Sequence, residues 1–306
     1  MIFRKYAFYY NLSYKMLFSR KLMNIINLFR LLRVEQWYKN TIIFIAIIFS
    51  FNLFNGYLFF LIFLGFLSLC FVSSSYYIIN DIADIDKDKI HPEKKTRPLA
   101  SKKISIFTAL LLSLILFDIS LFISYLLSKA FLILILCLFL LSQFYTFFVR
   151  NLVFLDIILI SINFVIRAIS GAFIINEPVS YWVILSTFFL SAFLVSSKRS
   201  IEISSNYVNS YRPFYNSSNK KVLEYFSVIS ITCVFVFFSI YSIVTEKPLL
   251  LLSLPVSIYI VFAFFNAMYI HPEKIRNPEK FIFDKKILIA LLIWLIVIII
   301  TFYSFI

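Results

Sequence analysis

Four polar side chains with regular spacing, at the end of a long apolar run, are the strongest candidates for chemistry in this sequence. They are Asn80, Asp81, Asp84 and Asp88, separated by one, three and four residues. On an α-helix this spacing places all four along one face, with Asn80, Asp84 and Asp88 one turn apart. Asp86 falls on the opposite side. The spacing therefore predicts a stripe of carboxylates along one helix face.

Carboxylates placed four residues apart repel one another unless a cation neutralises them. Mg²⁺ is the usual cation for converging oxygen ligands, because it takes one or two carboxylates and completes its coordination with phosphate oxygens and water. The alternative is a solvated acidic loop between two membrane spans. The acids begin where the apolar run ends, and a basic run that includes Arg97 follows directly. This arrangement favours a site for Mg²⁺ and a diphosphate.

A second polar cluster, at the end of a later apolar run, carries two cations and one acid. Its members are Lys198, Arg199 and Glu202. The acid is four residues from the lysine and three from the arginine, so one helix end presents both cations beside a carboxylate. Such cations are what a second phosphorylated group needs near a metal-bound diphosphate. The alternative is ordinary anchoring of a membrane helix by basic residues.

Further polar residues lie outside these two clusters. Lys39 and Asn40 directly precede the first apolar run, where Lys39 could instead extend its charge to the membrane surface. Asp118 and Arg167 fall within apolar runs, and an ionisable residue inside the membrane is a candidate functional group because it is costly to bury. A structural pair between these two is an open alternative.

The composition predicts a polytopic membrane protein. The 306 residues are 62% hydrophobic and 14% charged, whereas a soluble domain carries about 25% charge. Apolar runs of about twenty residues fit membrane helices better than barrel strands, so we expect an all-α bundle of about nine transmembrane helices. The first expected span is short. The expected spans are 41–55, 57–79, 104–127, 130–149, 152–175, 179–197, 222–245, 248–268 and 287–305.

Basic residues determine the expected orientation of these spans. Of the 29 Lys and Arg residues, all but Lys129, Arg167 and Lys247 lie on one side of the layout. The positive-inside rule then places the N-terminus and the long loops in the cytoplasm, with the protein in the cell membrane. The net charge of +14 is accordingly attributed to basic loops and anionic lipid head groups, and we expect no nucleic-acid partner.

The same layout predicts two parts of the chain. We expect a basic, interfacial N-terminal segment at 1–40 and a single transmembrane domain at 41–306. The loops at 80–103 and 198–221 are expected to carry the active site on the cytoplasmic side.

The acidic stripe resembles the first acidic motif of the UbiA superfamily of intramembrane prenyltransferases, and the resemblance covers nearly the whole chain from about Met23. Three further segments resemble the decaprenyl-phosphate phosphoribosyltransferase branch of that superfamily. They are Arg33-Val34-Glu35-Gln36-Trp37-Tyr38-Lys39-Asn40, similar to an R-P-x-Q-W-x-K-N motif with Val34 in place of proline; Leu155-Asp156 through Arg167-Ala168, similar to a fifth-span segment; and Lys198-Arg199-x-x-Glu202, similar to a K-R-x-E motif. The second Asp-rich motif that prenyl-diphosphate branches carry at that last place is absent.

This resemblance implies an Mg²⁺-dependent transfer of 5-phosphoribose from phosphoribosyl diphosphate to a polyprenyl phosphate. By position, it implies a catalytic and metal-binding role for Asp81, Asp84 and Asp88. It implies substrate binding by Lys39, Asn40, Asn80, Arg97, Lys198, Arg199 and Glu202.

Two other functions remain open at this point. A UbiA-type prenyltransferase, moving a polyprenyl group from its diphosphate to an aromatic or other small acceptor, would use the same aspartates but would be expected to carry acids near 198–202. A membrane transporter is favoured only by Asp118 and Arg167. The sequence shows no internal repeat and no paired broken spans of the kind found in transporters.

Overall fold

The structure, a computed structural model, describes residues 23, 25–90, 94–150, 152, 154–203, 217–276 and 281–303. Its secondary structure within these ranges is entirely helical. Seven helices in the described part of the chain are long and apolar enough to cross a membrane. A bilayer offers no partners to backbone N–H and C=O groups, so a spanning segment satisfies them within its own helix. The predicted all-α, multi-pass membrane architecture is confirmed.

Seven elements of the described residues are candidate spans. They are α3 (Gly56–Ala83), α5 (Ile106–Leu127), α6 (Lys129–Phe144) continued by the π-helical turn η3 (Tyr145–Val149), α7 (Leu155–Ile175), α8 (Tyr181–Ile203), α10 (Ser217–Val244), and the 3₁₀ helix η4 (Pro248–Ser253) continued by α11 (Leu254–Ile270). The shorter elements are η1 (Val34–Phe44), α2 (Ile45–Phe49), α4 (Ile85–Ile90), η2 (Lys94–Thr96) and α12 (Pro272–Arg276). A further apolar helix, α14 (Lys285–Tyr303), has 19 residues.

The predicted first span at 41–55 is not one continuous helix. The 3₁₀ helix η1 runs to Phe44, the five-residue α2 follows, and a turn then leads to α3. Ile43 and Ile47 of this segment are fully buried, and α2 packs on α7. The expected number of about nine spans is therefore approximate, with seven candidates and α14 in the described residues.

Two compact units make up the chain, and each is described by itself. The first comprises Met1–Lys39 and Cys70–Ser120, and the second comprises Asn40–Leu69 and Leu121–Ile306. The predicted N-terminal segment at 1–40 and single transmembrane domain at 41–306 stay predictions.

A small apolar core holds the first unit together around the end of α3. Leu31, Ile78, Leu99 and Leu116 are buried against one another, so the core joins the helical residues 25–32, α3, the segment after η2, and α5. The side-chain hydroxyls of Ser75 and Ser113 also bond between α3 and α5, at 3.0 Å. This packing fixes the segment just after η2, which is the segment that carries Arg97.

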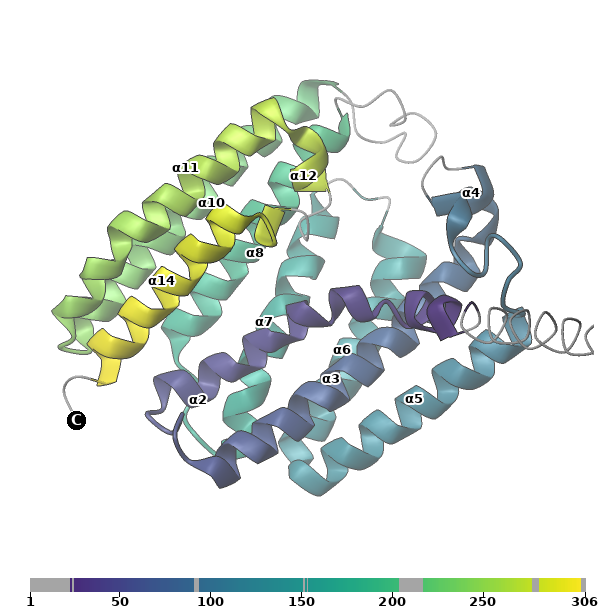
Figure 1. The fold of residues 1–306 in the computed structure, drawn as a ribbon, viewed down its shortest axis with the longest axis horizontal. Helices are drawn as coiled ribbons and strands as arrows, with labels where there is room; N and C mark the ends of the chain where they lie inside the picture. Colours follow the sequence, from purple (N-terminus) through teal and green to yellow (C-terminus); the bar gives the residue numbers. More distant parts are fainter. Residues whose placement is uncertain are drawn as a thin grey trace, which may run out of the picture. The chain divides into compact units, whose positions relative to one another are not determined.

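Helix α7 is the most buried helix of the second unit. It packs on α2, α6 and α8, while α10 lies along α8 and α11 lies along α14 (Figure 1). Small residues allow this close packing, as is usual between membrane helices. The buried small residues of α7 are Ser161, Ala168, Ser170, Gly171 and Ala172.

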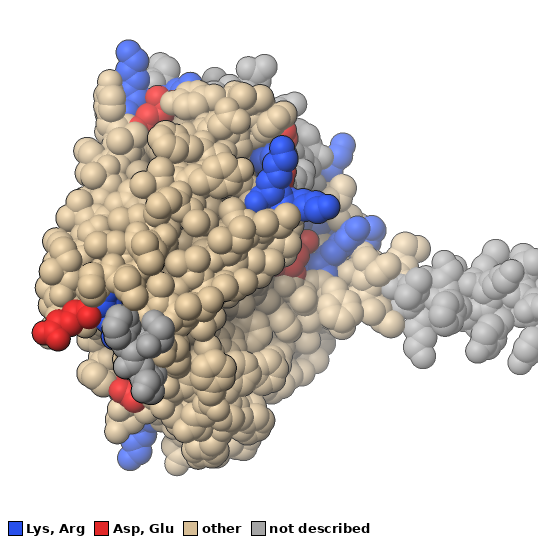
Figure 2. All heavy atoms as spheres, turned by 60° about the vertical axis from the view of Figure 1, so that its left-hand side comes forward, with Lys and Arg blue, Asp and Glu red and all other residues tan. Residues whose placement is uncertain are grey.

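The outward surface of the second unit is mostly apolar. Over α10, α11 and α14 the exposed side chains include Val236, Phe262 and Ile296. Figure 2 shows this side as a broad surface of uncharged residues, with Lys, Arg, Asp and Glu gathered at its margins. A surface of this composition suits contact with lipid chains.

Substitution of Gly171 tests the close contact between α7 and the segment before α3. A Cβ atom added to Gly171 would lie 2.4 Å from the backbone oxygen of Ile43 and 2.7 Å from the Cβ of Ala46. Backbone must move to relieve this contact, so we expect Gly171→Ala to lower the free energy of unfolding by about 1–3 kcal/mol. Thermal unfolding in detergent measures the effect. Gly56→Ala is the matched control because no atom lies within 4 Å of its added Cβ; equal midpoints for the two variants would contradict the packing.

Candidate functional site

The acidic stripe is built on a helix that continues from α3 into α4. The Asp84 amide donates to the Asn80 carbonyl at 3.0 Å, and the Asp88 amide donates to the Asp84 carbonyl at 2.8 Å. These are helical bonds four residues apart, and they run across the junction at Asp84. The predicted alignment of Asn80, Asp84 and Asp88 along one face is therefore confirmed.

Two arginines hold the buried carboxylates of this stripe. Nη1 of Arg97 donates to Asp81 at 3.0 Å and to Asp88 at 2.7 Å, and Nη2 of Arg33 also donates to Asp81. Asp81 and Asp88 are only 3% and 2% exposed, and carboxylates so buried require charged partners. We call Asp81, Asp84, Asp88, Arg33 and Arg97 the acidic cluster. All five belong to the first unit.

Arg33 is a member of this cluster that the spacing of the acids did not identify. It is separated from Asp81 by 48 positions, and its guanidinium lies 4.8 Å from the centre of the Tyr77 ring. Its φ of 50° is in the left-handed region, which is strained for a residue with a side chain. The only sequence signal for it was its place at the head of the segment ending in Lys39 and Asn40.

The electrostatic environments of Asp86 and Asp88 differ sharply. Burial raises the pKa of Asp88, against the opposing effect of Arg97. The hydrogen bond from Lys89 lowers the pKa of Asp86, whose side chain is 93% exposed. Asp86 thus lies outside the acidic cluster, as predicted, and provides an internal reference for it.

The donor set of the acidic cluster suits Mg²⁺ that arrives with a diphosphate. Asp81 and Asp88 converge on a single nitrogen of Arg97, which brings two carboxylates together. Mg²⁺ needs only one or two carboxylates when phosphate oxygens and water complete its coordination. Among the residues that the structure describes, no group of three His, Cys, Asp or Glu side chains is arranged to hold a metal. Metal binding by Asp81, Asp84 and Asp88 stays a prediction.

The segment before the first apolar run is fastened to α3 by hydrogen bonds. The indole of Trp37 donates to Ser74 at 3.1 Å, and the Ser74 hydroxyl donates to the Leu32 carbonyl at 2.8 Å. Lys39 donates to Gln36 at 3.1 Å. These bonds fix the backbone on both sides of Arg33.

Asn40, predicted to bind substrate, has a structural partner in the second unit. It is 1% exposed, and its side-chain oxygen accepts a hydrogen bond from Nε of Arg167 at 3.0 Å. Nη1 of Arg167 donates to the Asn163 carbonyl, also at 3.0 Å. Arg167 therefore joins α7 to η1, and substrate binding by Asn40 stays a prediction.

A buried arginine joins α7 to α8 in the second unit. Nε of Arg199 donates to Asp156 at 2.9 Å, and Nη1 donates to Glu202 at 2.6 Å. Asp156 is fully buried and the Arg199 side chain is 8% exposed. We call Asp156, Arg199 and Glu202 the arginine cluster; Lys198 is half-buried at the adjacent position of α8.

The pairing of Arg199 with Glu202 confirms the spacing argument, but the sequence did not identify Asp156 as a second partner of Arg199. Asp156 is separated from Arg199 by 43 positions, so no local spacing connects the two. The available signals were its place in the segment that resembles the fifth span of the branch, and an acid at the start of an apolar run, which is rare in membrane proteins. With two carboxylates already bound, Arg199 organises the meeting of α7 and α8 in addition to any contact with a substrate.

Comparisons with known proteins agree with the motifs in the sequence. The model of the UbiA prenyltransferase family matches residues 41–283. Decaprenyl-phosphate phosphoribosyltransferase of Mycolicibacterium smegmatis is 34% identical over 139 residues, which are 45% of this chain and 44% of that protein. Its counterpart in Corynebacterium glutamicum is 30% identical over 176 residues, or 56% of this chain and 53% of that protein. The resemblance to this superfamily and branch is thereby confirmed. The chain spans about half the length of these curated relatives.

Solved structures share the fold. A UbiA homologue from Archaeoglobus fulgidus, described as bound to GPP and Mg²⁺, superposes with a TM-score of 0.66 at 19% identity, covering 91% of this chain and 98% of that one. A digeranylgeranylglyceryl phosphate synthase gives a TM-score of 0.65 at 18% identity, covering 92% and 99%. At 18–19% identity, these two similarities show a shared arrangement of helices.

Proposed function

The chain belongs to the UbiA prenyltransferase family, and we propose on this basis that it transfers 5-phosphoribose from phosphoribosyl diphosphate to a polyprenyl phosphate, with release of diphosphate. The observation that carries the proposal is the acidic cluster, where Asp81 and Asp88 are buried together on Arg97. The names of the curated relatives support the choice of substrates.

In this reaction the bond between the anomeric carbon and the diphosphate oxygen breaks, and an oxygen of the lipid phosphate bonds to that carbon. The carbon gains oxocarbenium character as the leaving group departs, as in other glycosyl transfers. The lipid phosphate is already an anion, so the reaction needs no strong general base. The main requirement is to stabilise negative charge on the leaving diphosphate.

The acidic cluster supplies what that departure needs. Asp81 and Asp88, with Asp84 and Asn80 as further proposed ligands, would hold Mg²⁺, which neutralises charge developing on the diphosphate. Arg97 offers a guanidinium that suits phosphate as well as carboxylate oxygens. It would contact the diphosphate once the metal takes over Asp81 and Asp88.

Basic residues would bind the ribose 5-phosphate and the lipid phosphate. We assign Lys39, Lys198 and Arg199 to these two groups without dividing them further, and Glu202 would orient Arg199. Asn40 is assigned to the same group only through its position next to Lys39. The lipid chain would lie along apolar helix surfaces in the bilayer.

We further propose a cell-membrane location with the N-terminus and the long loops in the cytoplasm. The support is the concentration of Lys and Arg in those segments of the sequence. Phosphoribosyl diphosphate, a soluble and highly charged substrate, would then reach the acidic cluster from the cytoplasm.

A transfer assay tests the proposed activity. We expect purified protein in lipid or detergent, supplied with Mg²⁺, labelled phosphoribosyl diphosphate and a polyprenyl phosphate, to move label into the lipid phase. A chelator should abolish the transfer, and added Mg²⁺ should restore it. Movement of label from a polyprenyl diphosphate to an aromatic acid, with no phosphoribosyl transfer, would contradict the proposal and identify the chain as a prenyltransferase.

A further inference from the structure

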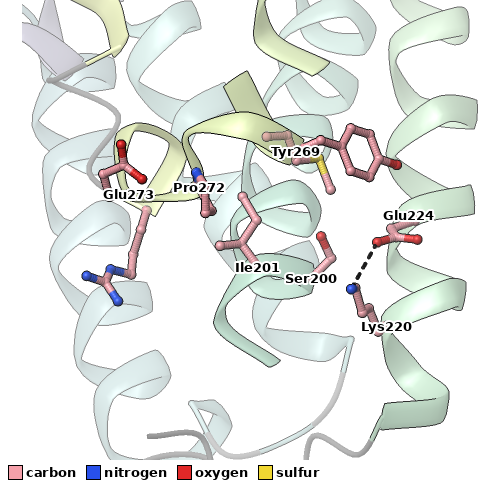
Figure 3. Close-up of a pocket in the computed structure, with 9 residues that line it drawn as sticks. Ser200, Ile201, Lys220, Glu224, Tyr269, Pro272 and Glu273 are labelled. Atoms are coloured by element: carbon pink, nitrogen blue, oxygen red, sulfur yellow. Dashed lines mark ion pairs between the residues drawn. The ribbon is translucent and has the colours of Figure 1, made fainter. Parts of the chain in front are cut away.

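Helix ends in the second unit enclose a cavity of about 440 Å³ that the proposed transfer does not use (Figure 3). The end of α8 lines it with Ser200 and Ile201, and the start of α10 lines it with Lys220 and Glu224. The end of α11 and the short helix α12 complete it. Its volume falls in the range of sites that bind small molecules.

The charges that the described residues bring to this cavity are balanced in sign. Helix α10 contributes Lys220 and Glu224, and α12 contributes Arg276 and Glu273. Figure 3 shows Glu273 on one side of Ile201, and Lys220 with Glu224 on the other. Two cations and two carboxylates attract a ligand that carries both signs, whereas a simple anion would be repelled by the acids as it was attracted by the bases.

Lys220 and Glu224 on α10 do not form a hydrogen bond with each other, so each can form one with a ligand. Nζ of Lys220 lies 3.9 Å from Oε1 of Glu224, which is beyond hydrogen-bond distance. Their side chains are 43% and 27% exposed, so both are accessible from the cavity without being fully hydrated. A ligand ammonium at the acid and a ligand phosphate at the base would therefore add hydrogen bonds that the pair does not make within itself.

The position of the cavity indicates an amphiphile. It lies where α8, α10 and α11, three candidate spans, begin or end. Met268, which lines the cavity, is buried, and Tyr269, a residue 71% exposed, has the mixed character typical of the boundary between membrane and water. Phospholipid head groups lie at this depth.

We propose that the cavity binds the head group of a zwitterionic phospholipid that carries a primary ammonium, of the phosphatidylethanolamine class. Lys220 would bind its phosphate, and the neighbouring Glu224 would accept hydrogen bonds from its ammonium. A primary ammonium has three N–H donors for this carboxylate. A choline head group has none and is typically bound by a cage of aromatic rings, whereas among the described residues that line this cavity Tyr269 is the one aromatic side chain.

Lipid retention by the full chain tests this proposal without reference to transfer activity. The delipidated protein in detergent is titrated with phosphatidylethanolamine, phosphatidylcholine and phosphatidylglycerol of identical acyl chains, and bound lipid is counted by native mass spectrometry. We expect the ethanolamine lipid to bind about tenfold more tightly than the other two, since one charge-assisted hydrogen bond is worth about that factor. Equal binding of the three lipids would overturn the proposal.

Variants locate the binding on the protein. Glu224→Gln should remove the preference for ethanolamine over choline, and Lys220→Met should weaken binding of all three lipids. Lys221→Met is the matched control, because the adjacent lysine is exposed on α10 and does not line the cavity. An unchanged preference in Glu224→Gln, or equal effects of the two lysine variants, would contradict the assignment.

A competition experiment distinguishes binding of the lipid head group from binding of a soluble phosphate compound. Glycerophosphoethanolamine, which has the head group without acyl chains, should displace the lipid at high concentration. Displacement by phosphoribosyl diphosphate at far lower concentration would show that the cavity is a substrate site and would overturn the proposal.

Discussion

The variant Asp84→Asn should lose phosphoribosyl transfer by about 10²–10³-fold while remaining folded in the membrane. Asp84 lies on the same helix face as Asn80 and Asp88, one turn from each. The amide keeps the shape of the side chain but removes a negative charge from the stripe that would hold Mg²⁺. The loss should appear in the rate at saturating substrate, because the charge acts mainly on the departing diphosphate.

Asp86→Asn is the control for this effect. Asp86 is on the same short helix, carries the same charge and pairs only with Lys89 among the ion pairs of the described residues. It should retain nearly full activity. Comparable losses in both variants would indicate general damage to α4 instead of a metal site, and full activity in Asp84→Asn would remove Asp84 from the proposed ligand set.

The second large effect concerns stability, and it follows from the arginine cluster. Replacing Arg199 with Met leaves the fully buried Asp156 without its arginine. Breaking one side of a buried ion pair costs about 3–5 kcal/mol, because the remaining charge is left in a medium of low polarity. We therefore expect Arg199→Met to lower the free energy of unfolding by that amount, measured by reversible denaturation in detergent.

A double variant distinguishes a stranded charge from lost packing. Asp156→Leu combined with Arg199→Met removes both charges, and it should recover most of the lost stability. Lys274→Met is a matched reference, since Lys274 and Asp284 form a pair at 2.7 Å whose side chains are about one third exposed. Its loss should cost at most about 1 kcal/mol. Failure of the double variant to recover would show that the arginine side chain acts by its volume.

Local spacing in the sequence was enough to predict those features whose partners lie within one or two helical turns. The stripe of Asn80, Asp84 and Asp88 and the pairing of Arg199 with Glu202 are of this kind. The membrane class followed from composition, because few charges can be placed in a bilayer. Local spacing and composition can both be read from the sequence, because neither depends on how the helices pack against one another.

The partners that the sequence did not reveal are distant along the chain. Arg33 reaches Asp81 across 48 positions, and Asp156 reaches Arg199 across 43. Neither pair follows a helical period, so each is decided by how helices pack. The division of the segment at 41–55 into η1, α2 and a turn was not visible in its apolar residues either, because it depends on how Ile43 and Ile47 pack inside the second unit.

The bridge from Arg97 to Asp81 and Asp88 has a consequence for the order in which ligands bind. In the acidic cluster, Arg33 and Arg97 offset two of the three carboxylates, so a divalent cation entering by itself would more than neutralise the remaining negative charge and create a local surplus of positive charge. A diphosphate entering by itself would face the same carboxylates without the cation that screens them. Electroneutrality therefore favours entry of the metal and the diphosphate as one complex, and we expect the apparent affinity for Mg²⁺ to rise with the concentration of phosphoribosyl diphosphate.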